Sequence, residues 1–229
     1  MLTASRECLS EAHKVLVTMR ESVDKRHMAF PPDSLKGLTG LVLVHSKKGA
    51  VGLGYETGQG VAVNVGYNED GSIHFSGPVP LKMTKLSVGA SIGFNIIYTL
   101  MAVQTRAQLQ QLITSPGAIV GKDINITAFI PYQHASQTAV NVNAAGGGMP
   151  PDMNNMIKVV SVSDSYMLTD FSLYGGSMTV DRDLMEDMYG RSVLPMDVLD
   201  GSIPAPVTLV DEMAELAGAF KDLLHTRPT

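Results

Sequence analysis

The sequence predicts an α+β fold: a glycine-rich antiparallel β-sheet, or a barrel-like curl of one, flanked by N- and C-terminal amphipathic helices. Near each end of the chain, apolar residues recur at helical spacing. Between the ends, most segments are β-branched or alternate apolar with polar residues, and many of the 22 glycines interrupt them. With 229 residues, of which 45% are hydrophobic, the chain is long enough to bury a core, and we treat residues 1–229 as a single domain.

Four helices are expected. The first spans residues 4–26, within an N-terminal segment 1–30, and its apolar stripe is Cys8, Ala12, Val15, Leu16, Met19 and Val23. Thr105 and Gln108 form a capping box that opens a helix to about residue 113. The acidic run that follows Val180 begins a short helix. The last helix covers residues 207–225, through Leu209, Met213, Leu216, Ala217, Phe220 and Leu224.

Strands are expected over residues 39–103 and again near 119–132, 156–164 and 167–180. The stretches LVLVHS, AVGLGY and VAVNVGY carry the strand signals, and Asn68-Glu-Asp-Gly71 is typical of a hairpin turn. Residues 133–155, with AAGGGMPPDMNN at their centre, have the composition of a flexible surface insertion.

Twenty uncharged residues separate Lys85 from Arg106, which is about the length of a membrane-spanning helix. From Leu86 to Ile96, however, apolar residues alternate with glycine, serine and asparagine. A period of two belongs to a strand with one apolar and one small polar face, so no transmembrane segment is predicted.

The net charge of −5 is unevenly distributed along the chain. Residues 1–48 contain eight Lys/Arg and five Asp/Glu, a balance of +3, whereas residues 161–229 contain four and twelve, a balance of −8. Such polarity lets one end meet an anionic partner. The alternative is that these charges are merely the solvated faces of terminal helices. Because the sequence shows no basic stripe interleaved with aromatics, nucleic acid is not an expected partner.

The single cysteine and the charged N-terminus point to a soluble, intracellular protein. Cys8 cannot form an internal disulfide, and charged residues within the first seventeen positions interrupt any signal-peptide core.

Two glycine patterns invite a catalytic or nucleotide-binding interpretation. Residues 89–93 spell G-x-S-x-G, but a hydrolase elbow needs a turn from strand into helix, and Ser91 lies inside an alternating run. The glycines between Gly52 and Gly60 lack the helix that a dinucleotide fingerprint requires. The six histidines show no metal-ligand spacing. No enzyme activity, metal or cofactor is therefore predicted.

Several spaced motifs resemble the SYLF domain family. In GLTGLVLVHSKKGAVGLGYETGQGVAV (37–63) and the preceding turn, the match is carried by Pro31-Pro32, Gly40-Leu41, Lys48-Gly49, Gly52, Gly54, Gly58 and Gly60-Val61. Asn68 to Ser72 with Phe75 and Pro78, then Gly89 and Gly93, and then the apolar run 97–103 continue it in order.

The resemblance extends to residue 201, from about residue 31. FSLYGGS (171–177) is similar to the family's V-S-L-E-G-S. MYGRSVLPMDVLDG (188–201) is similar to its F-Y-G-x-x-V-x-P-x-x-I-L-x-G, with Tyr189-Gly190, Val193, Pro195, Leu199 and Gly201 in place. Ser91, Tyr166 and Asp170 depart from the family pattern.

The resemblance implies a non-enzymatic, peripheral-membrane module that binds phosphoinositide lipids in membrane trafficking or cortical actin organisation. Family members are often joined to FYVE or SH3 domains, and some bind actin filaments. The implied location is cytoplasmic, peripheral to endosomal or plasma membrane. The alternative is a protein-interaction module that binds actin filaments or a trafficking partner without direct lipid contact. An exposed apolar patch would favour this alternative.

The residues expected to contact lipid headgroups are the cations of the basic N-terminal part. Near an anionic leaflet each contributes on the order of 1 kcal/mol, so several that face the same way would hold the domain reversibly. The candidate lipid-binding residues are Lys14, Arg20, Lys25, Arg26, Lys36, Lys47 and Lys48.

Overall fold

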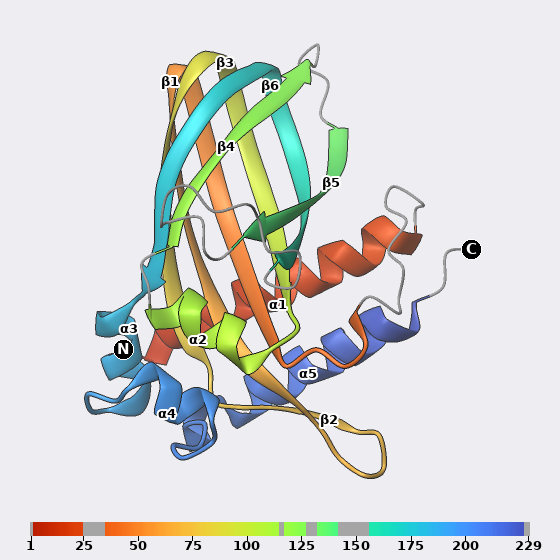
Figure 1. Ribbon diagram of the computed structural model, residues 1–229, viewed down its shortest axis with the longest axis vertical. Helices are drawn as coiled ribbons and strands as arrows, with labels where there is room; N and C mark the ends of the chain where they lie inside the picture. Colours follow the sequence, from red (N-terminus) through yellow and green to blue (C-terminus); the bar gives the residue numbers. More distant parts are fainter. Residues whose placement is uncertain (1, 25–34, 115–116, 127–131, 142–155, 227–229) are drawn as a thin grey trace.

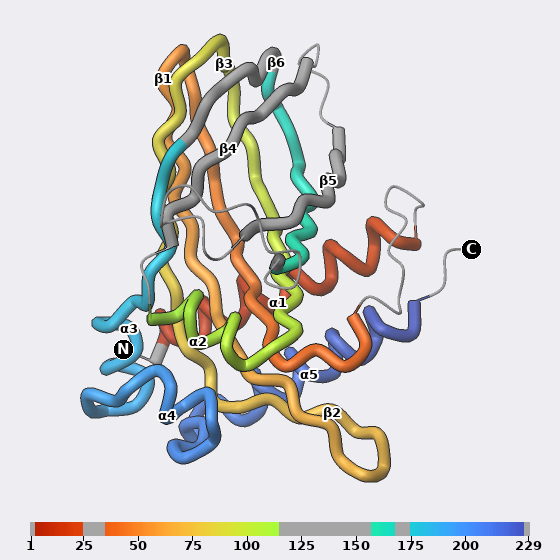
Figure 2. The backbone as a smooth tube through the Cα atoms, in the orientation of Figure 1, coloured from red at the N-terminus to blue at the C-terminus, as the bar shows by residue number. Residues whose placement is uncertain are grey.

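The computed structural model describes residues 2–24, 35–114, 117–126, 132–141 and 156–226 (Figures 1 and 2). Helices and strands follow one another as α1 (Leu2–Asp24), β1 (Gly40–Tyr67), β2 (Ile73–Phe75), β3 (Val79–Val103), α2 (Arg106–Thr114), β4 (Gly117–Ile126), β5 (Tyr132–Asn141), β6 (Met156–Val180), α3 (Arg182–Tyr189), α4 (Pro195–Leu199), a 3-10 turn (Val207–Leu209) and α5 (Val210–His225).

All six strands belong to one antiparallel sheet. Its order is β2-β1-β3-β6-β4, and β5 also pairs with β6. The strands described do not close into a ring, because β4 and β2 stand at the two ends of this order. The predicted α+β fold, an antiparallel sheet flanked by N- and C-terminal helices, is confirmed.

β1 doubles back on itself at Gly52. In a straight strand, Ser46 and Glu56 would lie about 33 Å apart, at about 3.3 Å per residue. Instead the Ser46 hydroxyl donates a hydrogen bond to Glu56 Oε1 at 2.7 Å. Closer to the helices, the backbone N–H of Val65 donates to Thr39 O at 2.8 Å. Gly52 has φ +76°, a conformation that glycine adopts without a steric penalty.

β3 and β6 follow β1 as two wider arches. β3 pairs with β1 from Gly40 opposite Val103 to Ala62 opposite Val79. β6 pairs along β3 in the same way, while β4 and β5 pair with the two arms of β6. The long strands therefore form nested arches, which bend at the end of the molecule remote from the helices (Figures 1 and 2). We call residues 46–58 of β1 and 84–96 of β3 the tip, and the helix-covered part of the sheet the base.

At the base, α1 and α5 pack side by side on one face of the sheet, which we call the outer face. Their apolar stripes meet alternate residues of the strands, as the helical and strand periodicities predict. This cluster contains Leu9, Leu16, Met19, Leu41, Leu43, Val61, Val63, Leu100, Val160, Leu216 and Phe220, all buried.

The opposite face, the inner face, carries a second buried cluster at the base. There α2, α3 and α4 cover the strands. Its members include Val42, Val44, Ala62, Val79, Leu81, Met83, Leu109, Ile157, Met178, Met185 and Val198. Both faces of the base are thus apolar and covered.

Local sequence signals locate several turns and caps correctly. The backbone N–H of Gln108 donates to Thr105 Oγ1 at 3.2 Å, and Gln108 Oε1 accepts from the backbone N–H of Thr105 at 3.1 Å, which is the predicted capping box. The Asn68–Gly71 turn forms, with Gly71 at φ +77°. The acidic run starts α3, whose N-cap is Asp181.

The predicted flexible insertion at residues 133–155 is wrong in its first part. Residues 133–141 belong to β5, which pairs with β6 from Tyr132 opposite Ser165 to Asn141 opposite Met156. Its mostly polar sequence is a weak strand signal, and the long-range pairing with β6 overrides it. Residues 142–155 lie outside the described residues. Within the described chain, we find no helix long and apolar enough to cross a membrane.

Candidate binding surface

The predicted lipid-binding lysines of β1 lie on opposite faces of the sheet. Lys47 is exposed on the outer face, whereas Lys48 is only 2% exposed and points to the inner face. Successive residues of a strand face opposite ways, so the two side chains do not share a surface. Lys48 is therefore not part of an exposed anion-facing surface. Lys36 is exposed just before β1. Lys25 and Arg26 lie outside the described residues.

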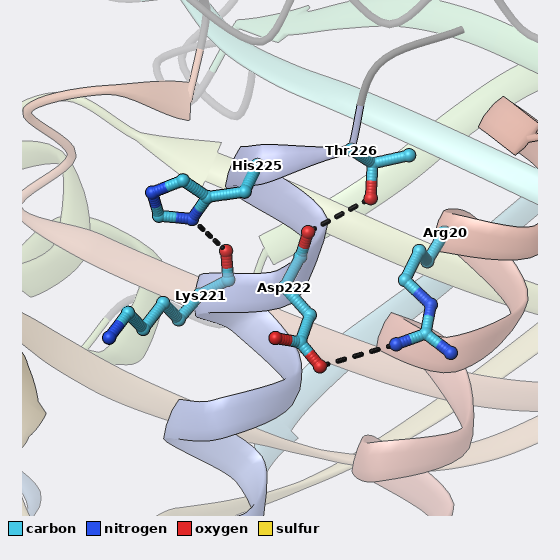
Figure 3. A network of polar contacts seen from close by, with 5 residues as sticks. All are labelled: Arg20, Lys221, Asp222, His225 and Thr226. Carbon is cyan, nitrogen blue, oxygen red and sulfur yellow. Dashed lines mark hydrogen bonds and ion pairs between the residues drawn. The ribbon is translucent and has the colours of Figure 1, made fainter. Parts of the chain in front are cut away.

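The two predicted cations of α1 form ion pairs within the molecule. Lys14 Nζ lies 2.7 Å from Glu11 Oε1 on the same helix. Arg20 Nη1 lies 3.2 Å from Asp222 Oδ2 on α5 (Figure 3). A third cation of α1 does the same, since Arg6 Nε lies 2.8 Å from Glu212 Oε1 on α5.

The charge difference between the two ends of the chain is thus partly compensated inside the molecule. Where α1 and α5 lie side by side, basic residues of the first helix meet acidic residues of the last. In Figure 3 the same turn of α5 also shows Thr226 and His225 bonding backward to the carbonyls of Asp222 and Lys221. Exposed pairs of this kind contribute little stability, but they reduce the positive field of α1.

A small mixed-charge cluster lies where α1 crosses β1. His45 Nδ1 is 2.7 Å from Glu11 Oε2, and the His45 ring stacks on Tyr98 with 5.1 Å between ring centroids. Burial lowers the pKa of His45, with Glu11 opposing this shift and Lys47 and Lys14 adding to it. The cluster joins the first helix to the outer face of the sheet, and it brings Lys14 and Lys47 close to one imidazole.

Polar side chains fill the inner face at the tip. Lys85 Nζ lies 3.0 Å from Glu56 Oε1, and this carboxylate also accepts the Ser46 hydroxyl. Ser87 Oγ and Asn95 Oδ1 are buried and have no hydrogen-bond partner in the part of the chain that the structure describes. The buried polar residues here are Ser46, Lys48, Glu56, Ser87, Ser91, Asn95 and Ser165.

Ser91 belongs to this inner face and is fully buried. His45 lies on the outer face, with its Nδ1 2.7 Å from Glu11 Oε2, so the sheet separates it from Ser91. β3 continues as a strand on both sides of Ser91, without the strand-to-helix turn that would expose a nucleophile. The G-x-S-x-G pattern is therefore part of a strand, and Ser91 is a buried residue of that strand.

The outer face at the tip is apolar and open to solvent. Cross-strand neighbours join its members into one patch: Val51 lies opposite Ile92, Leu53 opposite Val88, Tyr55 opposite Leu86, and Phe94 opposite Tyr166. These side chains are 42–82% exposed. We call this patch the apolar cap; its residues are Val51, Leu53, Tyr55, Leu86, Val88, Ile92, Phe94 and Tyr166.

The alternation in the sequence revealed the two faces of residues 86–96 but not which of them is covered. A strand with apolar and small polar faces is ordinarily expected to turn its apolar face to the core. Here the polar face is enclosed by the curl of the sheet and the apolar face is exposed.

We examined the described residues for a metal-binding cluster and for a reactive thiol. No group of three histidine, cysteine or acidic side chains in this part of the chain is placed to hold a metal ion. Cys8 is buried, and burial raises the pKa of its thiol to about 12, so it stays protonated. The described structure is an arched sheet with helices at one end and a broad exposed apolar surface at the other.

Comparison with known families identifies the family to which the chain belongs. The model of the Ysc84 family, described as "Las17-binding protein actin regulator", matches residues 84–221, and the chain belongs to this family. The matched region runs from the tip of β3 through α5, and it confirms the SYLF resemblance. Searches of curated proteins and of solved structures each found no match.

Most residues that carry the sequence resemblance have structural positions. Gly52 and Gly71 adopt positive φ in turns, and Gly190 ends α3 at φ +66°. The Tyr189 hydroxyl donates to Pro78 O at 3.0 Å, and Pro195 opens α4. These motif residues therefore help to form the arches and their helical base.

Proposed function

We propose that this chain is a non-enzymatic binding domain in actin regulation, and that it acts by binding a protein partner. The observation that carries this proposal is the family match over residues 84–221, with its description as a Las17-binding actin regulator. Actin filaments and Las17 are the two partners that the description suggests.

Co-sedimentation with actin filaments tests this function directly. We expect the full chain to pellet with filaments in a saturable manner and to stay in the supernatant when filaments are replaced by monomeric actin. Immobilised Las17 provides the second arm. A chain that binds neither filaments nor Las17 would contradict the proposal.

A second candidate is a peripheral-membrane module that recognises phosphoinositide headgroups, located in the cytoplasm at endosomal or plasma membranes. It is favoured by Lys36 and Lys47, which are exposed, and by Lys14, which lies near Lys47 beside His45. Against it stand the ion pairs of Lys14 and Arg20. Each exposed cation near an anionic leaflet contributes about 1 kcal/mol.

Charge reversal at the exposed lysines tests this candidate. Lys36→Glu with Lys47→Glu should reduce binding to phosphoinositide vesicles by at least tenfold, since two favourable charges become unfavourable. Arg191→Glu, an exposed cation on the loop after α3, is the matched control. Equal loss in both variants would indicate a general charge effect, and no loss in either would remove the headgroup site.

A further inference from the structure

The apolar cap exposes a group of apolar side chains to solvent, which is unfavourable unless another apolar phase covers them. We propose that the cap inserts into the hydrocarbon region of one leaflet of a lipid bilayer. This inference rests neither on the actin proposal nor on recognition of a phosphoinositide headgroup, because the driving force is removal of apolar surface from water.

The tip reverses the usual relation between the two faces of a sheet. Its inner face is buried and polar, with the Glu56–Lys85 ion pair and a series of serines, while its outer face is apolar and exposed. Strands that face lipid show this arrangement, apolar outward and polar inward. At the base the same strands are apolar on both faces, so the reversal is confined to the tip.

Away from the bend, the backbone groups of the cap are paired, which lowers the cost of entering hydrocarbon. Across the tip β3 pairs with β6 on one side and with β1 on the other, except at the bend, where Gly89, Ala90 and Ser91 have no partner residue in β1. Every unpaired N–H or C=O would cost several kcal/mol in a bilayer. A central position also means that the cap does not present a free strand edge for a partner strand to join.

Residues with polar ends border the cap. On the outer face, Lys47 lies below Val51 in one arm of β1, and Lys82 lies below Leu86 in β3; both are exposed. Tyr98 lies on the same face below Phe94, and the cap residue Tyr166 lies opposite Phe94. Lysine and tyrosine suit a membrane interface because an apolar stem or ring carries a polar end into the headgroups.

The height of the cap fits one leaflet. Lys47 lies five positions before the bend at Gly52, which at about 3.3 Å per residue gives this arm of the cap a height of about 17 Å. Half of a hydrocarbon core of about 30 Å is about 15 Å. The charge at the border distinguishes the bilayer from a second copy of the chain. Two caps apposed face to face would bring the same lysines together, whereas anionic headgroups attract them.

The absence of tryptophan from the chain allows a site-specific test. Leu53→Trp places a single indole in the cap, and Val207→Trp places one at the base, where Val207 is 89% exposed. Both are mixed with vesicles of phosphatidylcholine containing a minor fraction of phosphatidylserine and no phosphoinositide. We expect the emission of the Leu53→Trp protein to shift to shorter wavelength and to be quenched by acyl chains brominated below the headgroups, while the Val207→Trp protein shows neither effect.

Two further measurements separate insertion from its alternatives. Binding should persist at about 1 M salt, where the Debye length is about 3 Å and headgroup attraction is screened. Leu53→Asn with Val88→Asn should weaken vesicle binding by at least tenfold, with an unchanged melting temperature, because both side chains are exposed in the free protein. An unquenched indole at position 53 with vesicle-bound protein would overturn the proposal. So would failure to bind these vesicles, or a shift that grows with protein concentration without vesicles, which indicates a second copy.

Discussion

At the base, helices cover both faces of the long strands, whereas at the tip the same strands bury polar side chains and expose apolar ones. The alternation of side chains is continuous through both regions, so the difference lies in what covers each face. α1 and α5 end before the tip and leave its outer face bare (Figure 1). The comparison indicates that the base supplies most of the stability and that the tip is available for binding.

The largest expected difference is between two phenylalanines. Phe220 is fully buried at the base, and Phe94 is 42% exposed in the apolar cap. Phe220→Ala should reduce the free energy of unfolding by about 3–5 kcal/mol through lost burial and a cavity. Phe94→Ala should cost less than about 1 kcal/mol. Urea denaturation of both variants measures this, and equal losses would show that the tip belongs to the stabilising core.

The ion pair on the inner face tests whether the polar interior of the tip contributes to stability. Lys85→Met leaves the buried Glu56 carboxylate without its cation, which should cost about 3 kcal/mol. Glu56→Gln with Lys85→Met removes both charges and should regain most of this loss. A double variant no more stable than Lys85→Met would mean that the interior does not depend on matched charges.

Two glycines of β1 allow a comparison of the closely packed base with the more open tip. A Cβ at Gly60 would clash with the backbone carbonyl of Leu43, whereas a Cβ at Gly49 meets nothing within 4 Å. Gly60→Ala should cost about 1–3 kcal/mol through overpacking. Gly49→Ala should change stability by no more than about 0.5 kcal/mol. Thermal melting of both variants measures these changes in stability. A Gly60→Ala variant as stable as the unmodified protein would show that the two arms of β1 separate easily.

The smallest effect is expected at the boundary between the two regions, in the pH dependence of stability. Burial lowers the pKa of His45 below its ordinary value of 6.5, so the folded state binds fewer protons than the unfolded state. The contribution of His45 is then present in full above pH 6.5 and is lost as the pH falls below it. His45→Gln should flatten this part of the curve of unfolding free energy against pH. An unchanged slope would assign it to other groups.

Local chemistry made several elements predictable from the sequence. The capping box at Thr105 and Gln108, the turn at Asn68–Gly71 and the two terminal helices each depend on residues close together in the chain. The ion pairs between α1 and α5 could not be predicted, because Arg20 and Asp222 are 202 positions apart. The spacing of α1 apolar residues shows which face is buried, not which helix lies beside it.

The candidate surface was harder to predict than the fold. Strand alternation assigns Lys47 and Lys48 to opposite faces, but the expectation of a shared cationic surface ignored this period. The apolar cap was visible as alternation in residues 86–96, yet burial depends on how the sheet curls and on where the helices end. Both are set by contacts between segments far apart in the chain.

The order of pairing in the sheet differs from the order of synthesis. β4 and β5 pair with β6, which follows them in the chain, while β6 itself pairs with β3. During synthesis β1 can close on itself and receive β3 while β4 and β5 still lack the strand they pair with in the final sheet. β4 and β5 can therefore reach their final pairing only after β6 has been synthesised. The mostly polar sequence of β5 suits this interval without a partner, since an unpaired apolar strand would aggregate.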